Sequence, residues 1–116
     1  MSGTYRAMVA SEHASEIVVE MANLSDDDLP EGDVTVAVHY STLNYKDGLA
    51  LKGNQGKIMR RFPMVPGIDF AGVVEVSESS MFTPGDEVIL TGWGLGETHP
   101  GGFAQKARVN SQWIVE

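Results

Sequence analysis

The sequence predicts a mostly β domain, a closed or partly open barrel with one or two short helices. Short stretches in which apolar and polar residues alternate recur along the 116 residues, and this period of two is typical of strands with one buried face. Glycine occurs 13 times and proline 5 times, mostly between these stretches, where both residues favour turns. One stretch alone changes to a helical spacing. Many short strands with so little helix are typical of all-β barrels.

The first part of the chain predicts a hairpin followed by a polar connection. Residues 5–10 and 17–22 are apolar-rich runs separated by a polar stretch, which is the pattern of two strands joined by a turn. Residues 23–33 are polar and acidic, and we expect them on the surface. The three consecutive aspartates at 26–28 favour a solvated loop over a calcium site, because calcium loops space their ligands around a turn glycine.

A third strand and the helix follow. Apolar side chains alternate with small or polar ones over residues 34–41, the clearest strand pattern in the sequence. Residues 44–51 change to a helical spacing, and Gly53 is expected to end one or two helical turns. A basic connection with two glycines, over residues 52–59, leads to the second half of the chain.

The second half predicts further strands joined by glycine and proline turns. Pro63, Pro66 and Gly67 suit a loop that leads directly into a strand, since proline restricts both its own backbone and that of the preceding residue. Gly72 interrupts the alternation of that strand, as a bulge or a close approach of another backbone would. The predicted strands cover residues 68–77, 87–91, 103–109 and 113–115.

Composition excludes several classes of function. The chain has 8 Lys and Arg against 16 Asp and Glu, and its net charge of −8 disfavours binding to nucleic acid or to an anionic membrane. It contains no cysteine, so a disulfide, a thiolate nucleophile and a thiolate metal site are excluded. The first residues lack the apolar core of a signal peptide, and no run of about 18 apolar residues occurs. We therefore expect a cytoplasmic protein.

One stretch of the sequence resembles a known family. Residues 66–72, Pro-Gly-Ile-Asp-Phe-Ala-Gly, resemble the signature of the medium-chain dehydrogenase/reductase superfamily, whose zinc enzymes have Gly-His-Glu where this chain has Gly67-Ile68-Asp69. Ile68 cannot ligate zinc, and residues 44–47 lack the cysteine ligand that those enzymes supply there, so no metal is expected. The sequence is therefore similar to the zinc-free quinone oxidoreductase branch. Three stretches together resemble its acrylyl-CoA reductase type: 43–50, 60–72 and 91–94.

This resemblance implies a GroES-like substrate domain over residues 1–116 that reduces an α,β-unsaturated thioester, a CoA ester, or a quinone-like enone. NADPH supplies the hydride in the family, and a doubly wound Rossmann domain holds it on a glycine-rich turn. Gly92, Gly94 and Gly96 lack the last spacing of such a turn. We therefore expect no NADPH binding by this chain alone. We interpret it as a substrate domain without its nucleotide-binding domain, either a truncated piece or a free-standing gene product.

The resemblance places Asn44 and Tyr45 at the reacting centre. The phenol of Tyr45 could donate a hydrogen bond there, and Asn44 could orient the substrate or the cofactor amide. Each residue has a structural alternative, a ring in the core for Tyr45 and a helix cap for Asn44. Asp47 and Asp69 are expected to hold the site together, Asp69 as a buried acceptor for backbone or arginine donors.

Four further residues are candidates for substrate binding. Arg60 and Arg61 belong to a basic cluster in an acidic chain, and guanidinium groups pair phosphates of a CoA ester or of NADPH bidentately. Their alternative is a solubilising loop with ion pairs to nearby acids. Trp93 could form the wall of an acyl pocket or cap the end of the barrel. His99 lies in a loop that the resemblance places near the pocket.

Two functions from different classes stay open. The residue matches favour the oxidoreductase substrate domain, whereas the missing nucleotide-binding pattern favours a stand-alone, non-catalytic GroES-like binding or assembly module. The resemblance implies that a nucleotide-binding domain normally covers one side of this domain. Without it, we expect an exposed strand edge around residues 103–115, together with apolar surface near Tyr45, Phe62, Met64 and Trp93. Because the net charge opposes open-ended aggregation, the sequence predicts a homodimer.

Overall fold

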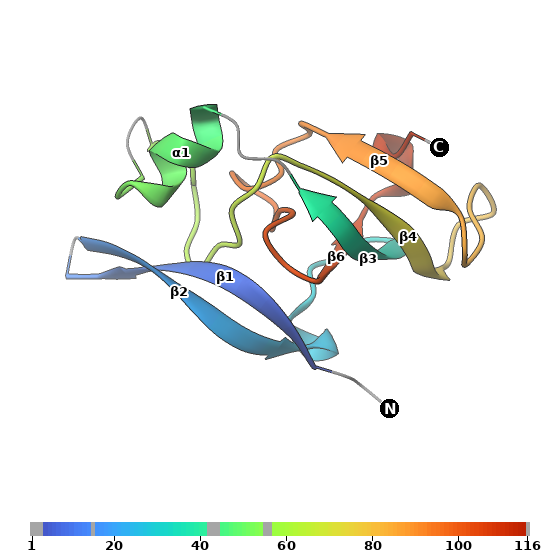
Figure 1. Ribbon diagram of the computed structural model, residues 1–116, viewed down its shortest axis with the longest axis horizontal. Coiled ribbons are helices and arrows are strands. Elements are labelled where there is room, and N and C mark those ends of the chain that lie inside the picture. Colours follow the sequence, from blue (N-terminus) through green and yellow to red (C-terminus); the bar gives the residue numbers. More distant parts are fainter. Residues whose placement is uncertain (1–3, 15, 42–44, 55–56, 116) are drawn as a thin grey trace.

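The computed structural model describes residues 4–14, 16–41, 45–54 and 57–115, without the side chains of Tyr45 and Lys46. The described elements are β1 (Thr4–His13), β2 (Glu16–Ser25), η1 (Asp26–Asp28), β3 (Val34–Ser41), α1 (Tyr45–Leu51), β4 (Asp69–Ser77), β5 (Glu87–Thr91), β6 (Lys106–Val109) and η3 (Ser111–Trp113). They form a hairpin of β1 and β2 and a four-stranded antiparallel sheet in the order β5-β4-β3-β6. The mostly β prediction is confirmed, and the sheets do not close into a full barrel (Figure 1).

The predicted hairpin exists and is longer than its apolar runs. Its two strands pair from Thr4 opposite Ser25 to His13 opposite Glu16. Backbone pairing continues into the polar residues, because their side chains can extend into water. Hydrophobic alternation therefore marks only the part of the hairpin that packs against other segments. The connection expected at 23–33 therefore begins later than predicted, since β2 runs to Ser25.

Gly72 lies where two strands of the larger sheet approach most closely. It pairs with Val38 of β3, and the register shifts between Val38 and Tyr40, so a bulge lies beside it. A Cβ atom on Gly72 would come within 2.1 Å of the carbonyl oxygen of Ala37. The prediction of a bulge or close backbone approach is confirmed. A second register shift, between Thr35 and Val36, leaves Val76 of β4 exposed, although simple alternation would bury it.

A main core fills the inner face of the four-stranded sheet, and a second core lies where the hairpin meets the segment before β4. Each alternating strand contributes its inward residues to the main core, which includes Val34, Val36, Phe70, Val74, Val88, Leu90, Ala107 and Val109. The second core contains Ala10, Ala50, Met59 and Met64. Met64 is only 3% exposed, so the prediction of bare apolar surface there is wrong, and Phe62 packs half-buried against this core.

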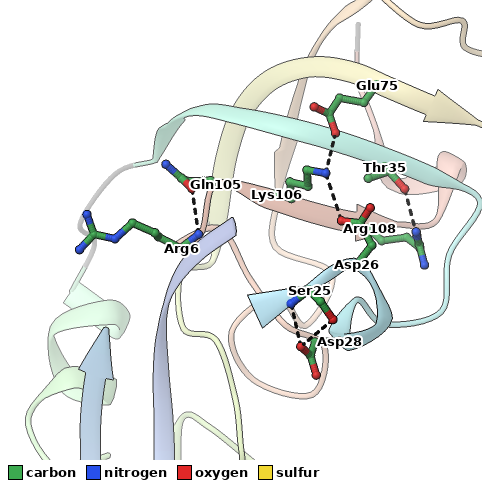
Figure 2. A network of polar contacts seen from close by, with 9 residues as sticks. All are labelled: Arg6, Ser25, Asp26, Asp28, Thr35, Glu75, Gln105, Lys106 and Arg108. Carbon is green, nitrogen blue, oxygen red and sulfur yellow. Dashed lines mark hydrogen bonds and ion pairs between the residues drawn. The ribbon is translucent and has the colours of Figure 1, made fainter. Parts of the chain in front are cut away.

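Backbone bonds and one ionic cluster join the hairpin to the larger sheet. Met8 of β1 donates to the carbonyl of Phe103 at 2.8 Å, and Gln105 donates to the carbonyl of Arg6 at 2.9 Å. Lys106 of β6 lies 3.1 Å from Asp26 and 3.5 Å from Glu75 (Figure 2). Asp26 is therefore tied to the sheet, which corrects the expectation of a solvated loop for this residue of the acidic run.

The end of the chain departs from the predicted strands. Only Lys106–Val109 of the predicted strand 103–109 is regular, because Phe103 and Gln105 bond to the hairpin and the preceding loop instead of to β3 alone. Residues 111–113 form the short helix η3, and Val115 bridges to Ile89 of β5. The side chain of Asn110 caps η3 by accepting from the N–H of Gln112, which turns the chain before a strand can form. No helix in the described ranges is long and apolar enough to cross a membrane.

Candidate functional site

A buried carboxylate joins helix α1 to the segment that enters β4. Asp47, only 1% exposed, accepts a hydrogen bond at 3.0 Å from the backbone N–H of Ile68. The carbonyl of Ile68 in turn accepts from the N–H of Gly92 at 2.9 Å. Ile68 therefore connects the helix to the loop that carries Trp93. This link brings three segments together that lie far apart in the sequence.

Two residues were expected at the reacting centre, Asn44 and Tyr45. Tyr45 is the first residue of α1. Its side chain lies outside the described part of the structure, as does the whole of Asn44. Their predicted roles stay predictions.

Residues 92–99 form a tight loop with three successive left-handed residues. The φ angles are 74° at Gly92, 56° at Trp93 and 80° at Gly94. The carbonyl of Gly94 accepts from the N–H groups of Glu97, Thr98 and His99 at 3.0, 2.9 and 3.1 Å. Because these N–H groups point back into the loop, they do not form a cradle for a pyrophosphate.

Two close glycine contacts seat this loop against the segment before β4. A Cβ atom on Gly96 would lie 2.7 Å from the nitrogen of Gly67, and one on Gly101 would lie 2.0 Å from the carbonyl oxygen of Gly67. The N–H of Gly101 donates to the carbonyl of Val65 at 2.8 Å. Side chains at these glycines would separate the two segments, so the sequence Pro-Gly-Gly after the loop has a packing role.

The two arginines lie along the same loop. The backbone N–H of Arg60 donates to the carbonyl of Glu97 at 2.8 Å, and the guanidinium of Arg61 donates to the carbonyl of Thr98. Both arginine side chains are exposed. The positive charge of Arg61 therefore lies beside the loop that carries Trp93 and His99.

Trp93 and His99 meet on a third aromatic residue that sequence reasoning did not select. Trp93 is stacked on Trp113 with ring centroids 6.2 Å apart and 10° between the planes. The edge-on ring of His99 lies 5.0 Å from Trp113, and its Nε2 donates to the carbonyl of Arg108 at 2.7 Å. Trp113 was expected in a strand. The polar run from Asn110 to Gln112 is the sequence signal for the turn that brings it here.

Asp69 is the other residue that was expected to hold the site together. It is the first residue of β4, opposite Thr91 of β5, and its side chain is half-buried, whereas a buried acceptor was expected. The structure thus brings Arg60, Arg61, Trp93 and His99 to one loop, and Asp47 supports that loop through Ile68. Lys57 is exposed in the preceding connection.

Two surface grooves lie away from these residues. One, of about 360 Å³, lies between the hairpin and the sheet and is lined by Arg6, Met8, Met21, Ser41, Phe103, Ala104 and Gln105. The other, of about 520 Å³, follows β3, β4 and β5 and is lined by His39, Tyr40, Ala71, Gly72, Val73, Glu87, Val88 and Ile89. The groove along the strands adjoins the bulge beside Gly72, where β3 and β4 approach each other closely.

Comparison with known proteins identifies the family. Alcohol dehydrogenase GroES-like domains match residues 30–116. The acrylyl-CoA reductase AcuI of Ruegeria pomeroyi is 53% identical over 104 residues, which are 90% of this chain and 31% of that protein. The probable acrylyl-CoA reductase AcuI of Escherichia coli K12 is 53% identical over 110 residues, 95% of this chain and 34% of that protein. The chain thus spans about a third of the length of these relatives.

A solved structure agrees with this match. The crystal structure of the YhdH oxidoreductase from Salmonella enterica in complex with NADP superposes with a TM-score of 0.91 at 51% identity, covering 95% of this chain and 34% of the other. The resemblance to the acrylyl-CoA reductase type is therefore confirmed, and so is the predicted GroES-like fold. The chain belongs to the family of alcohol dehydrogenase GroES-like domains.

Proposed function

We propose that this chain is the substrate domain of an NADPH-dependent reductase that acts on an α,β-unsaturated thioester, such as a CoA ester, or on a related enone. The similarity to acrylyl-CoA reductases carries the proposal, because 53% identity extends over 95% of the chain. The loop of Trp93 and His99 supports it, because Arg60 and Arg61 of the preceding segment are both hydrogen-bonded to that loop.

The described residues do not fit the cofactor pyrophosphate. The N–H groups of Glu97, Thr98 and His99 are used within their own loop, and α1, at seven residues, is too short to hold the diphosphate at its start. NADPH would supply a hydride to the β-carbon of the substrate. We propose that groups outside these 116 residues hold it and that the isolated chain binds it weakly or not at all.

The chain's own residues would bind and orient the acyl group. In this proposal the Tyr45 phenol donates a hydrogen bond to the oxygen that becomes negative as the enolate develops, and Asn44 orients the substrate or the nicotinamide amide. Asp47 fixes the helix that carries Tyr45, through its bond to Ile68. Asp69, at the start of β4, supports the same segment.

The exposed arginines would bind the phosphates of the CoA ester. A phosphate is a stronger, charged acceptor than the Thr98 carbonyl, so Arg61 could exchange its present bond for a bidentate one. Arg60 is bound through its backbone, which leaves its side chain exposed beside the same loop. Trp93 and His99 would border the acyl end. Reduction of a CoA ester by NADPH belongs to the reducing cytoplasm, which is the proposed compartment.

We also propose a homodimer, whose contact surface differs from the one expected from the sequence. Met64 is buried, but Tyr40 is 74% exposed, Ile89 53% and Val115 65%, and Tyr40 and Ile89 line the same groove. Val115 lies beside Ile89 through their bridge. Exposed apolar side chains gathered around the edge strand β5 favour self-association. The same surface would serve a non-catalytic assembly module, which is the alternative function.

Nuclear magnetic resonance titration of the isolated chain separates the two functions. Propionyl-CoA is a suitable probe because it carries the CoA phosphates but no double bond to reduce. We expect it to shift the signals of Arg60, Arg61 and Trp93, and we expect the Arg60→Gln, Arg61→Gln double variant to weaken binding while the control Arg6→Gln does not. Binding of NADPH at micromolar concentration would overturn the cofactor assignment. Absence of any propionyl-CoA shift would favour the assembly module.

A further inference from the structure

Trp93 is held in a conformation that the backbone alone would not favour. A bulky residue with φ of 56° is uncommon, because the left-handed region crowds its Cβ atom. Its indole is 61% exposed, so burial does not compensate for that cost. Strain at an exposed side chain that the surrounding structure fixes in place is typical of a functional position.

Trp113 fixes one face of the ring. It packs against the main core, which contains Leu90, Leu95 and Ile114. The two indoles are nearly parallel, and the offset stack leaves much of Trp93 in contact with water. Aromatic pairs in such offset arrangements attract each other beyond their buried area.

His99 fixes Trp113 in turn. Its ring meets Trp113 at 86°, and its Nε2 is bonded to the backbone carbonyl of Arg108 on strand β6. The chain from β6 through His99 and Trp113 to Trp93 therefore connects the exposed ring to the sheet. A ring held in this way loses little further freedom when a ligand stacks on it, which favours binding.

We propose that Trp93 is a stacking platform for a flat, conjugated ring, and that Trp113 and His99 are the residues that position it. The ligand's ring would lie against the indole face turned away from Trp113, extending the existing stack by one layer. Flat rings gain dispersion and quadrupole attraction on such a face, whereas a puckered aliphatic ring of similar size touches it at few atoms. The platform therefore selects planar over puckered ligands.

At the acyl end that Trp93 borders, the platform would favour substrates whose unsaturated group carries a flat, conjugated ring. This inference rests on the proposed function only in treating that ligand as the substrate. The platform itself is tested without cofactor or turnover. Failure of the reductase activity would therefore leave the platform standing, and failure of the platform would leave the reductase proposal standing.

The test compares two anions of equal charge, naphthalene-2-sulfonate with its flat ring and camphor-10-sulfonate with its puckered one. The chain has two tryptophans, Trp93 and Trp113, so its spectrum has two indole N–H signals that single substitutions assign. We expect naphthalene-2-sulfonate to bind about tenfold more tightly and to move the Trp93 indole signal upfield by its ring current. Equal affinity for the two anions, or a shift confined to signals away from Trp93, would overturn the proposal.

Variants separate the platform from its support. Trp93→Leu should abolish the preference for the flat anion, whereas the control Met81→Leu, an exposed apolar residue before β5, should keep it. Trp113→Phe retains a stacking ring and should keep most of the preference, and Trp113→Leu should lose most of it. Because Trp113 packs on the core, its variants could lose stability, so the unsubstituted chain provides a second measurement: nuclear Overhauser contacts between the ring protons of Trp93 and Trp113. Absence of these contacts would contradict the stack itself.

Discussion

Asp47 and Ile68 lie 21 residues apart in the sequence, and the buried carboxylate of the first accepts the backbone N–H of the second at 3.0 Å. This bond joins the helix that begins with Tyr45 to the segment that enters β4. The carbonyl of Ile68 then accepts from Gly92, which starts the loop of Trp93. The candidate site thus depends on one backbone residue that is bonded on both sides.

Replacing Asp47 tests this dependence. Asp47→Ala leaves the N–H of Ile68 without its acceptor, and we expect the free energy of unfolding to fall by about 1–3 kcal/mol. Asp47→Asn keeps an oxygen that can accept this bond and should cost less. Urea denaturation of the two variants and the unsubstituted chain measures the difference. Equal stability of all three proteins would show that the bond contributes nothing.

Alanine substitutions at two glycines, Gly72 in the sheet and Gly48 in helix α1, test the close approach of β3 and β4. Gly72→Ala places a methyl group against the carbonyl of Ala37, and we expect destabilisation of about 1–3 kcal/mol. A Cβ atom on Gly48, within α1, would meet no other atom within 4 Å, so Gly48→Ala should stabilise the chain by about 0.5–1 kcal/mol. Thermal unfolding of both variants measures these changes. A Gly72→Ala protein as stable as the parent would contradict the close approach of β3 and β4.

Alkaline pH should destabilise the fold through two groups. The hydrogen bond to Asp26 raises the pKa of Lys106 above its usual 10.5, and burial, with the charges of Asp28 and Asp26, raises the pKa of Tyr5 above 10.0. A pKa raised by folding contributes stability that is present below the unfolded value and lost as the pH rises through the folded value. We expect stability to fall above about pH 10, and less steeply in Lys106→Met and in Tyr5→Phe. If the free energy of unfolding depended on pH in the same way in all three proteins, the raised pKa values of Lys106 and Tyr5 would be contradicted.

The sequence predicted the strands where packing and alternation coincide. Residues 34–41 and 87–91 were predicted with their observed bounds, and β4 begins one residue later than predicted. Prediction failed where side chains or long-range bonds override alternation. Asn110 turns the chain into η3, and Phe103 pairs with the hairpin across nearly a hundred residues, which no local pattern reveals.

The site was predicted less completely than the fold. Motifs selected Arg61, Trp93 and His99; Trp93 and His99 lie on one loop, and Arg61 donates to the carbonyl of Thr98 in it. Trp113 was missed because its partnership with Trp93 is a contact across 20 residues, made by a short turn with no periodic signal. The buried position of Met64 was missed for the same reason, since its partner Ala10 lies on the hairpin.

A single charged substitution at the proposed interface should dissociate the dimer into monomers. Ile89→Glu places a carboxylate on the exposed outer face of β5, where burial in an interface would be costly. We expect twice the chain mass for the unsubstituted protein in sedimentation equilibrium at micromolar concentration, and the monomer mass for the variant. The control is Val76→Glu, at an exposed position near the end of β4. Val76 lies outside the groove along β3, β4 and β5, so this variant should leave the dimer intact. A monomeric parent would exclude the dimer.

The most direct test of the reductase assignment is a chimera in which this chain replaces the corresponding N-terminal third of the acrylyl-CoA reductase of Ruegeria pomeroyi. We expect acrylyl-CoA-dependent oxidation of NADPH within about tenfold of the relative's own rate, and a kcat at least about tenfold lower for the Tyr45→Phe chimera. NADPH binding by the remaining two-thirds of the protein shows that the chimera is folded. A chimera that binds NADPH but shows no acrylyl-CoA-dependent oxidation would contradict the assignment of this chain as the substrate domain.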